Sequence, residues 1–168
     1  MRLVPLAAEH LGAVGAMLDD AEVRRFTRIP EPPPPDFAQH WLARYEEGRR
    51  AGSREAFAAL DDDGRFVGIA LAPHIDREAR EVELGYITAP AARGRGVATR
   101  MLGLLTQWAF EAAGAFRIVL IIDVANSASE RVAERCGYVR EGVMRSIHVK
   151  QGIRADTGLW SRLPSDPA

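Results

Sequence analysis

Apolar side chains recur with helical spacing in two N-terminal segments and again beyond the middle of the chain. The first two segments are residues 11–20 and 37–50, and the second carries the apolar positions Phe37, Trp41, Leu42 and Tyr45. The third segment ends near Gly114 and carries the apolar positions Val97, Met101, Leu104, Leu105, Trp108 and Ala112. Because an α-helix repeats about every 3.6 residues, each segment would present one apolar stripe to a core. The pattern therefore predicts three amphipathic helices.

Strand patterns occur at residues 55–60, 65–73, 81–88 and 117–124, and the chain also opens with an apolar run that fits a short strand. The first two segments are separated by the turn sequence DDDG, which predicts a hairpin. The third segment alternates between the two faces of a strand, so Glu83 and Ile87 would lie on one face. The fourth is an almost continuous apolar run, which is typical of a strand covered on both faces.

The C-terminal part of the sequence predicts a short helix followed by two strands. Ser127 and Glu130 match a capping box at the start of this helix, and Gly137 suits its exit. The two strands follow and would be joined near Gln151-Gly152. A run of four prolines earlier in the chain favours a stiff loop inside the domain. Together these elements predict a mixed α/β sheet.

Length and composition narrow the class of protein. A chain with 47% hydrophobic residues fits one globular domain, residues 1–168. The net charge of -1 does not indicate a nucleic-acid or membrane-surface binder, and no segment has the roughly 20 apolar residues that a membrane span needs. Cys136 is the only cysteine, which excludes an internal disulfide and a multi-cysteine metal site. Lys150 is the only lysine, so no Walker motif is present, and the four dispersed histidines do not form a metal site. We expect a soluble, cytoplasmic protein without a metal.

The stretch APAARGRGVATR, residues 89–100, lies between a predicted strand and a predicted helix. The N-terminus of a helix has free backbone N–H groups and a partial positive charge, so it is a natural anion site. Gly94 and Gly96 would leave those groups uncovered, and Arg93 and Arg95 add donors that match phosphate oxygens. The glycine spacing does not fit the dinucleotide-binding GxGxxG motif, which disfavours NAD. The stretch predicts a pyrophosphate site, and an ordinary strand-to-helix turn is the alternative.

The sequence RGRGVA at residues 93–98 matches the arginine-or-glutamine, x, x, glycine, x, glycine-or-alanine signature of the GNAT superfamily of N-acetyltransferases, which bind acetyl-CoA. The preceding VELGYITAP and the following NSASERVAERCGYVREG also resemble this family, especially the branch that includes ribosomal-protein N-terminal acetyltransferases. The three segments occur in the family's order, and the predicted elements suit it along nearly the whole chain. The resemblance implies a mostly antiparallel twisted sheet of about six to seven strands, about four flanking helices and a splayed strand pair that holds the cofactor.

The resemblance also implies where acetyl-CoA would bind. The backbone of Ile87 and Thr88 would pair with the pantetheine arm as a strand does, and the amides of the glycine turn would hold the pyrophosphate. Asn126 and Ser129 match the family's N-x-x-S segment near the arm and the thioester, with helix capping as the alternative. The implied cofactor-binding residues are Ile87, Thr88, Arg93, Gly94, Arg95, Gly96, Val97, Ala98, Thr99, Asn126 and Ser129.

Acetyl transfer to an amine requires a neutral amine, so a general base is expected. Glu83 is the first candidate, because it shares the strand face of Ile87 beside the cofactor; an exposed strand carboxylate is the alternative. His148 is the second candidate, since it lies in the strands that should close over the acceptor and a histidine titrates near neutral pH. A lone histidine is more often a surface or core residue, so both readings stay open.

The proton donor that is usual in the family is missing. Many members carry a tyrosine on the helix before the Gly-aromatic pair, where this chain has Ala133. Ser129, one helical turn earlier, could replace it or hold a water, or the thiolate could leave without a dedicated acid. Cys136 is expected to be a small core residue rather than an acyl-carrying nucleophile. The catalytic candidates are Glu83, Ser129 and His148.

The sequence leaves the acceptor open. Analogy with the family branch favours a peptide N-terminus, while an aminoglycoside, a polyamine or an amino acid stays possible. The predicted lining residues are Phe26, Pro33, Phe37, Trp41, His148 and Trp160, although aromatic residues at helical spacing more often belong to a core. A non-catalytic acyl-CoA-binding domain is the alternative of a different class. An exposed sheet edge could support a homodimer.

Overall fold

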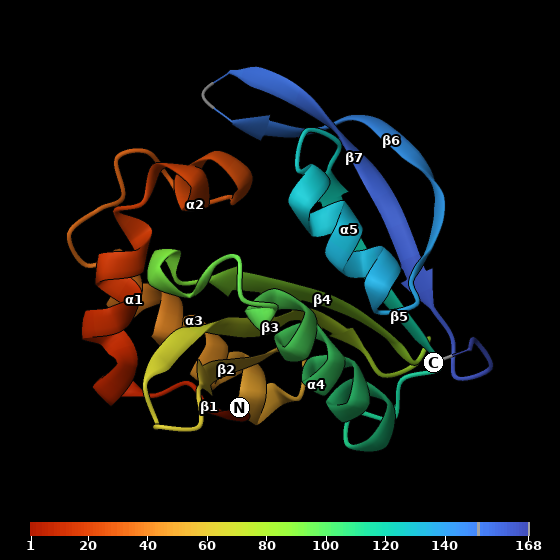
Figure 1. Cartoon of the computed structure of the whole chain (residues 1–168), viewed down its shortest axis with the longest axis horizontal. Helices are drawn as coiled ribbons and strands as arrows, with labels where there is room; N and C mark the ends of the chain where they lie inside the picture. Colours follow the sequence, from red (N-terminus) through yellow and green to blue (C-terminus); the bar gives the residue numbers. More distant parts are fainter. Residues whose placement is uncertain (151, 168) are drawn as a thin grey trace.

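Seven strands form one sheet in the computed structural model, which describes residues 1–150 and 152–167. The strands are β1 (Arg2–Pro5), β2 (Glu55–Leu60), β3 (Phe66–Asp76), β4 (Glu81–Thr88), β5 (Arg117–Asp123), β6 (Val139–Lys150) and β7 (Ile153–Arg162). Their order across the sheet is β1-β2-β3-β4-β5-β7-β6, and β4 and β5 form the only parallel pair among these strands. The predicted mixed, mostly antiparallel sheet is confirmed (Figure 1).

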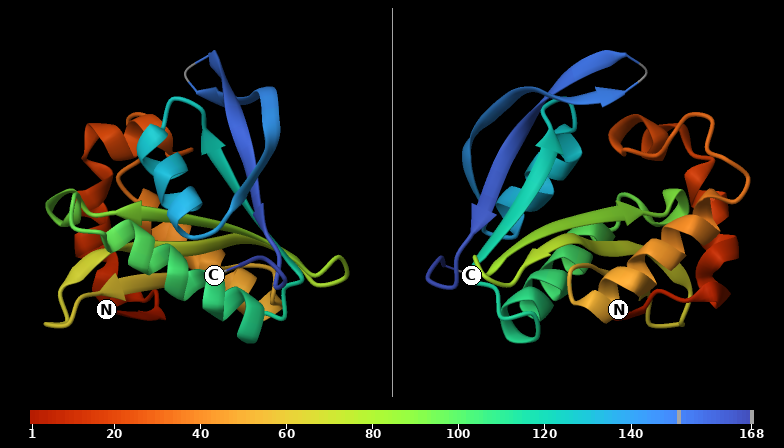
Figure 2. Two further views of the ribbon diagram at one scale, coloured as in Figure 1. Left: turned by 45° about the vertical axis from the view of Figure 1, so that its right-hand side comes forward. Right: turned by 180° about the vertical axis from the view of Figure 1, so that it is seen from behind.

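Helices cover both faces of this sheet (Figure 1, Figure 2). They are α1 (Leu11–Leu18), α2 (Ala21–Phe26), α3 (Phe37–Ala51), α4 (Val97–Glu111) and α5 (Ser127–Arg135), with short 3-10 turns at Ala8–His10 and Pro90–Ala92. The helices α1 and α3 share one apolar core with the sheet, while α4 and α5 share another on the opposite face. The strand β5 is apolar along nearly its whole length, as its sequence predicts: Ile118, Leu120 and Ile122 lie in the core with α4 and α5, and Val119 on its other face is also buried.

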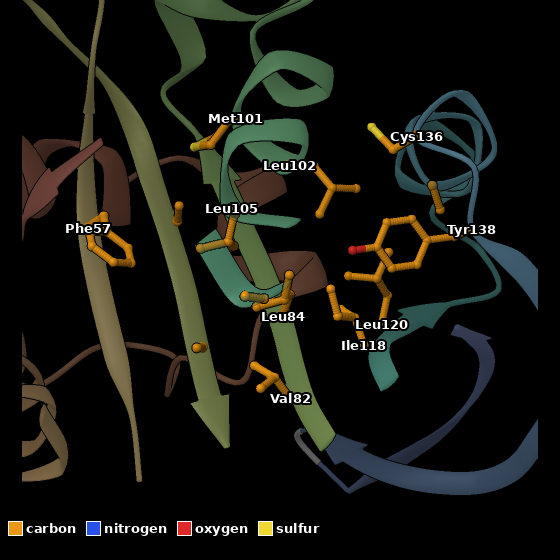
Figure 3. Close-up of a cluster of buried hydrophobic side chains, with 14 of the residues drawn as sticks. Phe57, Val82, Leu84, Met101, Leu102, Leu105, Ile118, Leu120, Cys136 and Tyr138 are labelled. Atoms are coloured by element: carbon orange, nitrogen blue, oxygen red, sulfur yellow. The ribbon is translucent and has the colours of Figure 1, made fainter. Parts of the chain in front are cut away.

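The larger core lies between the sheet and α4 (Figure 3). Met101, Leu102 and Leu105 project from α4 at helical spacing and are fully buried. They belong to one cluster with alternate residues of the two central strands, namely Val82, Leu84, Ile118 and Leu120. The Thr106 hydroxyl, also on α4, is 2.7 Å from the Tyr138 hydroxyl, so these two buried hydroxyl groups satisfy one another. This packing fixes the N-terminal end of α4 beside β4.

The helix α2 is not predicted by the apolar pattern. It has six residues and one buried side chain, Val23, so it carries no period that a pattern could reveal. A cap starts this helix, because the Asp20 carboxylate accepts a hydrogen bond from the Val23 N–H at 2.9 Å. The described residues thus form five α-helices, one more than the roughly four that the family resemblance implies.

The start of α5 differs from the predicted capping box. Asn126, not Ser127, is the N-cap, and its side-chain oxygen accepts a hydrogen bond from the Ser129 N–H at 3.1 Å. Asparagine is among the strongest N-cap residues, so the helix begins one position earlier than the serine would set it. The predicted junction of the last two strands includes Gln151, which lies outside the described residues; β6 and β7 flank it.

The central strands β4 and β5 are paired over only part of their length. Their parallel register joins Glu81–Leu84 to Arg117–Leu120 and ends there. Beyond this point β4 stays paired with β3 and β5 stays paired with β7, while the two strands diverge from one another (Figure 2, right). We call this divergent part, residues 85–88 of β4 and 121–123 of β5, the β4–β5 fork. The splayed strand pair implied by the resemblance is therefore present.

The hairpin of β6 and β7 arches over toward the segment that follows α2 (Figure 1). Lys150 Nζ donates a hydrogen bond to the Thr27 carbonyl at 3.1 Å, and the Arg28 guanidinium donates one to His148 Nε2. These two contacts join residues 123 and 120 positions apart in sequence. They bring the hairpin and the α2–α3 loop together beside the open end of the β4–β5 fork (Figure 2, right).

Candidate active site

The fork leaves one edge of β4 without a neighbouring strand. Ile87 and Thr88 lie on this part of β4, where the ladder to β5 has ended. Their opposite edge is engaged, because they pair with Ile69 and Gly68 of β3. A strand edge of this kind offers N–H and C=O groups in register to an extended ligand that carries amides. The geometry suits the expected pairing of this edge with a pantetheine arm.

The glycine turn follows β4 and leads into α4. Gly94 and Gly96 have positive φ angles of 74° and 72°, and Gly96 is the N-cap of α4. A Cβ added at either glycine would meet no protein atom within 4 Å, so the space beside the turn is open. Val97, Ala98 and Thr99 form the first helical turn, whose N–H groups have no partner within a helix, and the N-cap makes no side-chain bond to them. These amides can therefore bind an anion.

The two arginines of the turn have different partners. The Arg93 guanidinium binds the Asp20 carboxylate at 2.6 Å and the Glu22 carboxylate at 3.0 Å, so it ties the turn to α2. Its hydrogen bond to Asp20 lowers the pKa of that carboxyl group. Arg95 is exposed and donates to the Ala91 carbonyl within the turn. Arg93 thus meets carboxylates where a phosphate was expected, and Arg95 remains the more accessible of the two.

The start of α5 lies across the fork from β4. Asn126 uses its side-chain oxygen as the helix cap, as described above, and the carbonyl of Ser129 accepts a hydrogen bond from the Tyr86 hydroxyl at 3.4 Å. Burial raises the pKa of Tyr86 to about 12, so this hydroxyl stays protonated near neutral pH. Tyr86 therefore links β4 to the first turn of α5.

Glu83 lies where β4 and β5 begin to separate. It shares the face of β4 that carries Ile87, and this is the face covered by α1 and α3. Its neighbours in the adjacent strands are His74 and Val119. Burial raises the pKa of Tyr45 on α3 to about 12, and the charge of Glu83 contributes a smaller part of that rise. The Glu83 carboxylate therefore lies on the α1–α3 face, within electrostatic range of Tyr45.

His148 lies half-buried on the hairpin. Burial and the nearby Arg28 charge lower its pKa, while Asp123 at the end of β5 opposes this change. Since a guanidinium can only donate, His148 Nε2 is the acceptor of the bond from Arg28. The nitrogen that would take a proton from an amine is thus already engaged.

The helix position that carries a tyrosine in many relatives is part of the core in this chain. Ala133 is fully buried in the cluster between α4, α5 and the sheet. Cys136 belongs to the same cluster, and its Sγ is 3.5 Å from the Thr99 carbonyl. Burial raises the pKa of this thiol, which disfavours the nucleophilic thiolate. The prediction of a core cysteine is confirmed.

One of the predicted lining residues, Trp160, is placed wrongly by the sequence reasoning. It is 3% exposed and packs in the core on the α4 side, because it pairs with Leu120 and points to the same face. Phe26 and Pro33 are half-buried in the region between α2 and α3. A hollow of about 180 Å³ on α3 is lined by Phe37, His40, Trp41 and Arg44.

Several residues enter this region without any signal in the sequence. They are Asp20, Arg28, Tyr86 and Lys150, and each has a partner at least 43 positions away. Contacts over such distances depend on the folded topology and not on local spacing. Within residues 1–150 and 152–167, no group of three or more His, Cys, Asp and Glu side chains is arranged to hold a metal ion. The helices in this part of the chain are also too short or too polar to cross a membrane.

Comparisons with known proteins agree with this geometry. The model of the acetyltransferase (GNAT) domain family matches residues 1–139. A relative from Bacillus subtilis, named "Putative ribosomal N-acetyltransferase YdaF", is 31% identical over 106 residues, which are 63% of this chain and 58% of the relative. The chain thus spans less than two thirds of that relative's length.

Two solved structures share the fold. Spermidine N-acetyltransferase from Vibrio cholerae, in complex with CoA and spermine, superposes with a TM-score of 0.85 at 20% identity, covering 98% of this chain and 95% of the other. RimL, a ribosomal L7/L12 alpha-N-protein acetyltransferase in complex with coenzyme A, superposes with a TM-score of 0.89 at 18% identity, covering 96% and 92%. At these identities the likeness shows the architecture alone.

Proposed function

Because the chain belongs to the GNAT acetyltransferase domain family, we propose that residues 1–168 act as one domain that transfers an acetyl group from acetyl-CoA to a primary amine. We further propose that this amine is a peptide N-terminus. The observation that carries the proposal is the β4–β5 fork, which opens next to a helix start that has no side-chain cap and follows two glycines of positive φ. A thioester with a diphosphate and an amide-bearing arm fits these two features together.

The proposed cofactor site uses backbone groups for most of its contacts. The turn from Arg93 to Thr99 supplies amides for the pyrophosphate, with the Arg95 side chain as an added donor. Ile87 and Thr88 supply the strand edge for the arm. We assign Asn126 and Ser129, in the cap and first turn of α5, to the arm and the thioester end; the bond from the Tyr86 hydroxyl to the Ser129 carbonyl, which joins this turn to β4, supports the assignment.

The proposed chemistry moves one proton off the amine and one onto sulfur. The amine nitrogen bonds to the thioester carbon, the carbon–sulfur bond breaks, and CoA leaves as a thiolate that takes up a proton. We assign the role of general base to Glu83, acting directly or through a water. Glu83 lies where β4 and β5 begin to separate, on the face covered by α1 and α3. His148 is the weaker candidate, since Arg28 engages its Nε2. We assign proton donation to Ser129 or to a water that it holds.

The test is acetylation of defined amines by the purified protein. CoA release and the mass of the product are measured with peptides that have free N-termini, with an aminoglycoside and with spermidine. We expect turnover with peptides and none with the same peptides blocked at the N-terminus. Turnover confined to spermidine or an aminoglycoside would contradict the peptide assignment. CoA binding without turnover on any amine would identify a non-catalytic binding domain instead.

We also propose that the protein forms a homodimer through β6. This strand lies at the edge of the sheet and exposes Val143, Ile147 and Val149, and Ile153 of β7 is exposed beside it. An edge strand with apolar side chains is a template for pairing with another strand. Light scattering should give twice the mass of the chain, and substitution of Ile147 by lysine should return the mass of one chain.

A further inference from the structure

Two positively charged side chains lie where the hairpin reaches the α2–α3 loop. Arg28 of the loop contacts His148 of β6, and Lys150, two residues further along β6, binds the carbonyl of Thr27. We call Arg28, His148 and Lys150 the basic cluster. It lies beside the open end of the fork, on the side where the α2–α3 loop and the hairpin come together (Figure 2, right).

Within the residues that the structure describes, no ion pair includes Arg28 or Lys150. The acidic groups of this region have other partners. Asp123 accepts from the Ala125 N–H, Asp156 accepts from the Ser146 N–H, and Glu31 pairs with Arg24.

The described part of the chain thus places the Arg28 guanidinium against His148 and the Lys150 ammonium against the Thr27 carbonyl, with no ion pair to either cation. An anion bound here would be attracted by both charges. Burial, and after it the Arg28 charge, lower the pKa of His148, while the Asp123 charge opposes this change. Further exposed cations are Arg25 near the end of α2 and Arg145 and Arg154 of the hairpin. The region is therefore basic in a chain whose net charge is -1.

We propose that the basic cluster selects acceptors that carry negative charge close to the reacting amine, and specifically peptides with acidic side chains just after the N-terminal residue. This inference rests on the proposed function and names the class of its acceptor. Arg28 and Lys150 would bind the carboxylates while the terminal amine enters the fork. The same charges repel a polyamine, whose ammonium groups would lie against them.

The test compares acceptors that differ only in charge. Three hexapeptides share an N-terminal serine and differ at the next two positions, which are both glutamate, both glutamine or both lysine. We expect kcat/KM to fall about tenfold from glutamate to glutamine and again to lysine, as for partly solvated charge pairs. Added NaCl should shrink these ratios because salt screens exposed charges. Free glutamate serves as the small-molecule acid, and we expect it to be a poorer acceptor than the acidic peptide.

Variants of the cluster then locate the preference. Arg28→Gln and Lys150→Gln keep donors at these positions but remove the charge, and each should reduce the glutamate-to-glutamine ratio. Arg28→Glu with Lys150→Glu should reverse the order toward the lysine peptide. Arg50→Ala, an exposed arginine near the other end of α3, is the matched control and should leave the ratio unchanged. The Tm of every variant checks that the fold is retained, and the Kd for CoA is measured separately.

Each of the remaining possible results would contradict the inference and would identify the reason. Equal kcat/KM on the three peptides would remove the charge preference but keep the proposed function. Preference for free glutamate over the acidic peptide would assign the cluster to a small anionic acceptor. A weaker Kd for CoA in the glutamine variants, with unchanged peptide ratios, would assign the cluster to the cofactor. No turnover on any peptide would overturn the proposed function together with this inference.

Discussion

At Gly96 the backbone conformation matters as much as the missing side chain. Its φ of 72° is strained for any residue with a Cβ, and a Cβ there would enter the open space beside the first turn of α4. Gly114, after the end of α4, has a φ of 70° and equally open surroundings, but it lies away from the proposed pyrophosphate site. A comparison of substitutions at these two glycines therefore distinguishes the effect of backbone strain from the effect of ligand contact.

We therefore predict different outcomes for Gly96→Ala and Gly114→Ala. Both should lower the free energy of unfolding by about 1 kcal/mol, the usual cost of a left-handed residue with a side chain. Only Gly96→Ala should also weaken CoA binding, by about tenfold or more, because its methyl group would meet the ligand. Urea unfolding and calorimetric titration measure the two effects. Equal CoA affinity in the two variants would show that the turn does not contact the cofactor.

Glu83 is the residue whose chemical role is most directly tested by substitution. Glu83→Gln should lower kcat by about 10² to 10³, since a positioned general base contributes on that order. It should also flatten the rising limb of the pH–rate profile, because glutamine cannot take a proton. Glu81→Gln is the control, as it lies on the same face of β4 but pairs with Arg117. If both variants keep the wild-type profile, another group accepts the proton.

The residues of the glycine turn could be predicted from the sequence, but the partner of Arg93 could not. Glycines before a helix indicate an anion site because the signal is local. The pairing of Arg93 with Asp20 joins residues 73 positions apart, and no local sequence feature near either residue indicates it. The same limit applies to Tyr86, whose strand face was predictable while its bond to Ser129 was not.

One residue, Asp20, makes two interactions that stabilise the helix α2. Asp20 caps the helix through the Val23 N–H and binds the Arg93 guanidinium. We predict that Asp20→Asn, which keeps a capping oxygen but loses the charge, lowers stability by about 0.5 kcal/mol, as for a partly exposed ion pair. Asp20→Ala loses the cap as well and should cost about 1 kcal/mol more.

Chemical denaturation of both variants, each repeated in an Arg93→Ala background, measures the two contributions separately. In that background Asp20→Asn should have almost no effect, whereas Asp20→Ala should still lose the cap. An undiminished effect of Asp20→Asn without Arg93 would show that the ion pair is not the source of the stability. The ion pair between Arg93 and Asp20 also predicts a higher KM for the acceptor in Arg93→Ala, because α2 would no longer be tied to the glycine turn.

Elements with a clear period were predicted closely, and elements set by one contact were not. The boundaries of β4 agree with the predicted residues 81–88, because the strand alternates over its whole length. The helix α2 was missed because it buries only Val23. The cap of α5 was placed one residue late, since Asn126 and Ser127 are both good capping residues and the sequence does not rank them.

At the scale of the molecule, Arg117 joins three strands at the closed end of the fork. Its guanidinium binds Glu81 of β4 at 2.8 Å and makes a two-oxygen contact with Glu141 of β6 at 2.6 and 2.7 Å. Ser161 of β7 donates a further hydrogen bond to Glu141. These bonds, first those from Arg117, lower the pKa of Glu141 to about 2.

This shift predicts the response of stability to acid. A carboxyl group whose pKa is lower in the folded state stabilises the protein above its unfolded pKa, and the gain is lost as pH falls from that value, 4.5, toward about 2. Glu141→Gln should therefore lower Tm by about 2 to 4 °C near pH 6, allowing about 1 kcal/mol for a partly exposed pair. Near pH 2 the variant and the wild type should have almost equal Tm. A difference that persists at pH 2 would mean that the glutamine damages packing instead.

The sequence predicts the class of sheet but not which strands end up side by side across it. Family resemblance supplied the splayed pair, and the apolar run of β5 indicated burial on both faces. The placement of Trp160 failed because its face depends on the register with Leu120, which the sequence alone does not fix. The contacts of Arg28 with His148 and of Lys150 with Thr27 likewise follow from the curvature of the hairpin over the α2–α3 loop.

The short register between β4 and β5 also leaves a break in the sheet. Four residue pairs form the ladder between the β1–β4 half of the sheet and the half made by β5, β6 and β7, and residues 85–88 lie past its end. A coenzyme bound along residues 85–88 would supply the strand-like hydrogen bonds that are missing there and would make the junction more rigid. The amide protons of residues 85–88 should exchange with solvent quickly in the free protein and slowly once the coenzyme is bound, because the bound coenzyme would complete the hydrogen bonding of this strand.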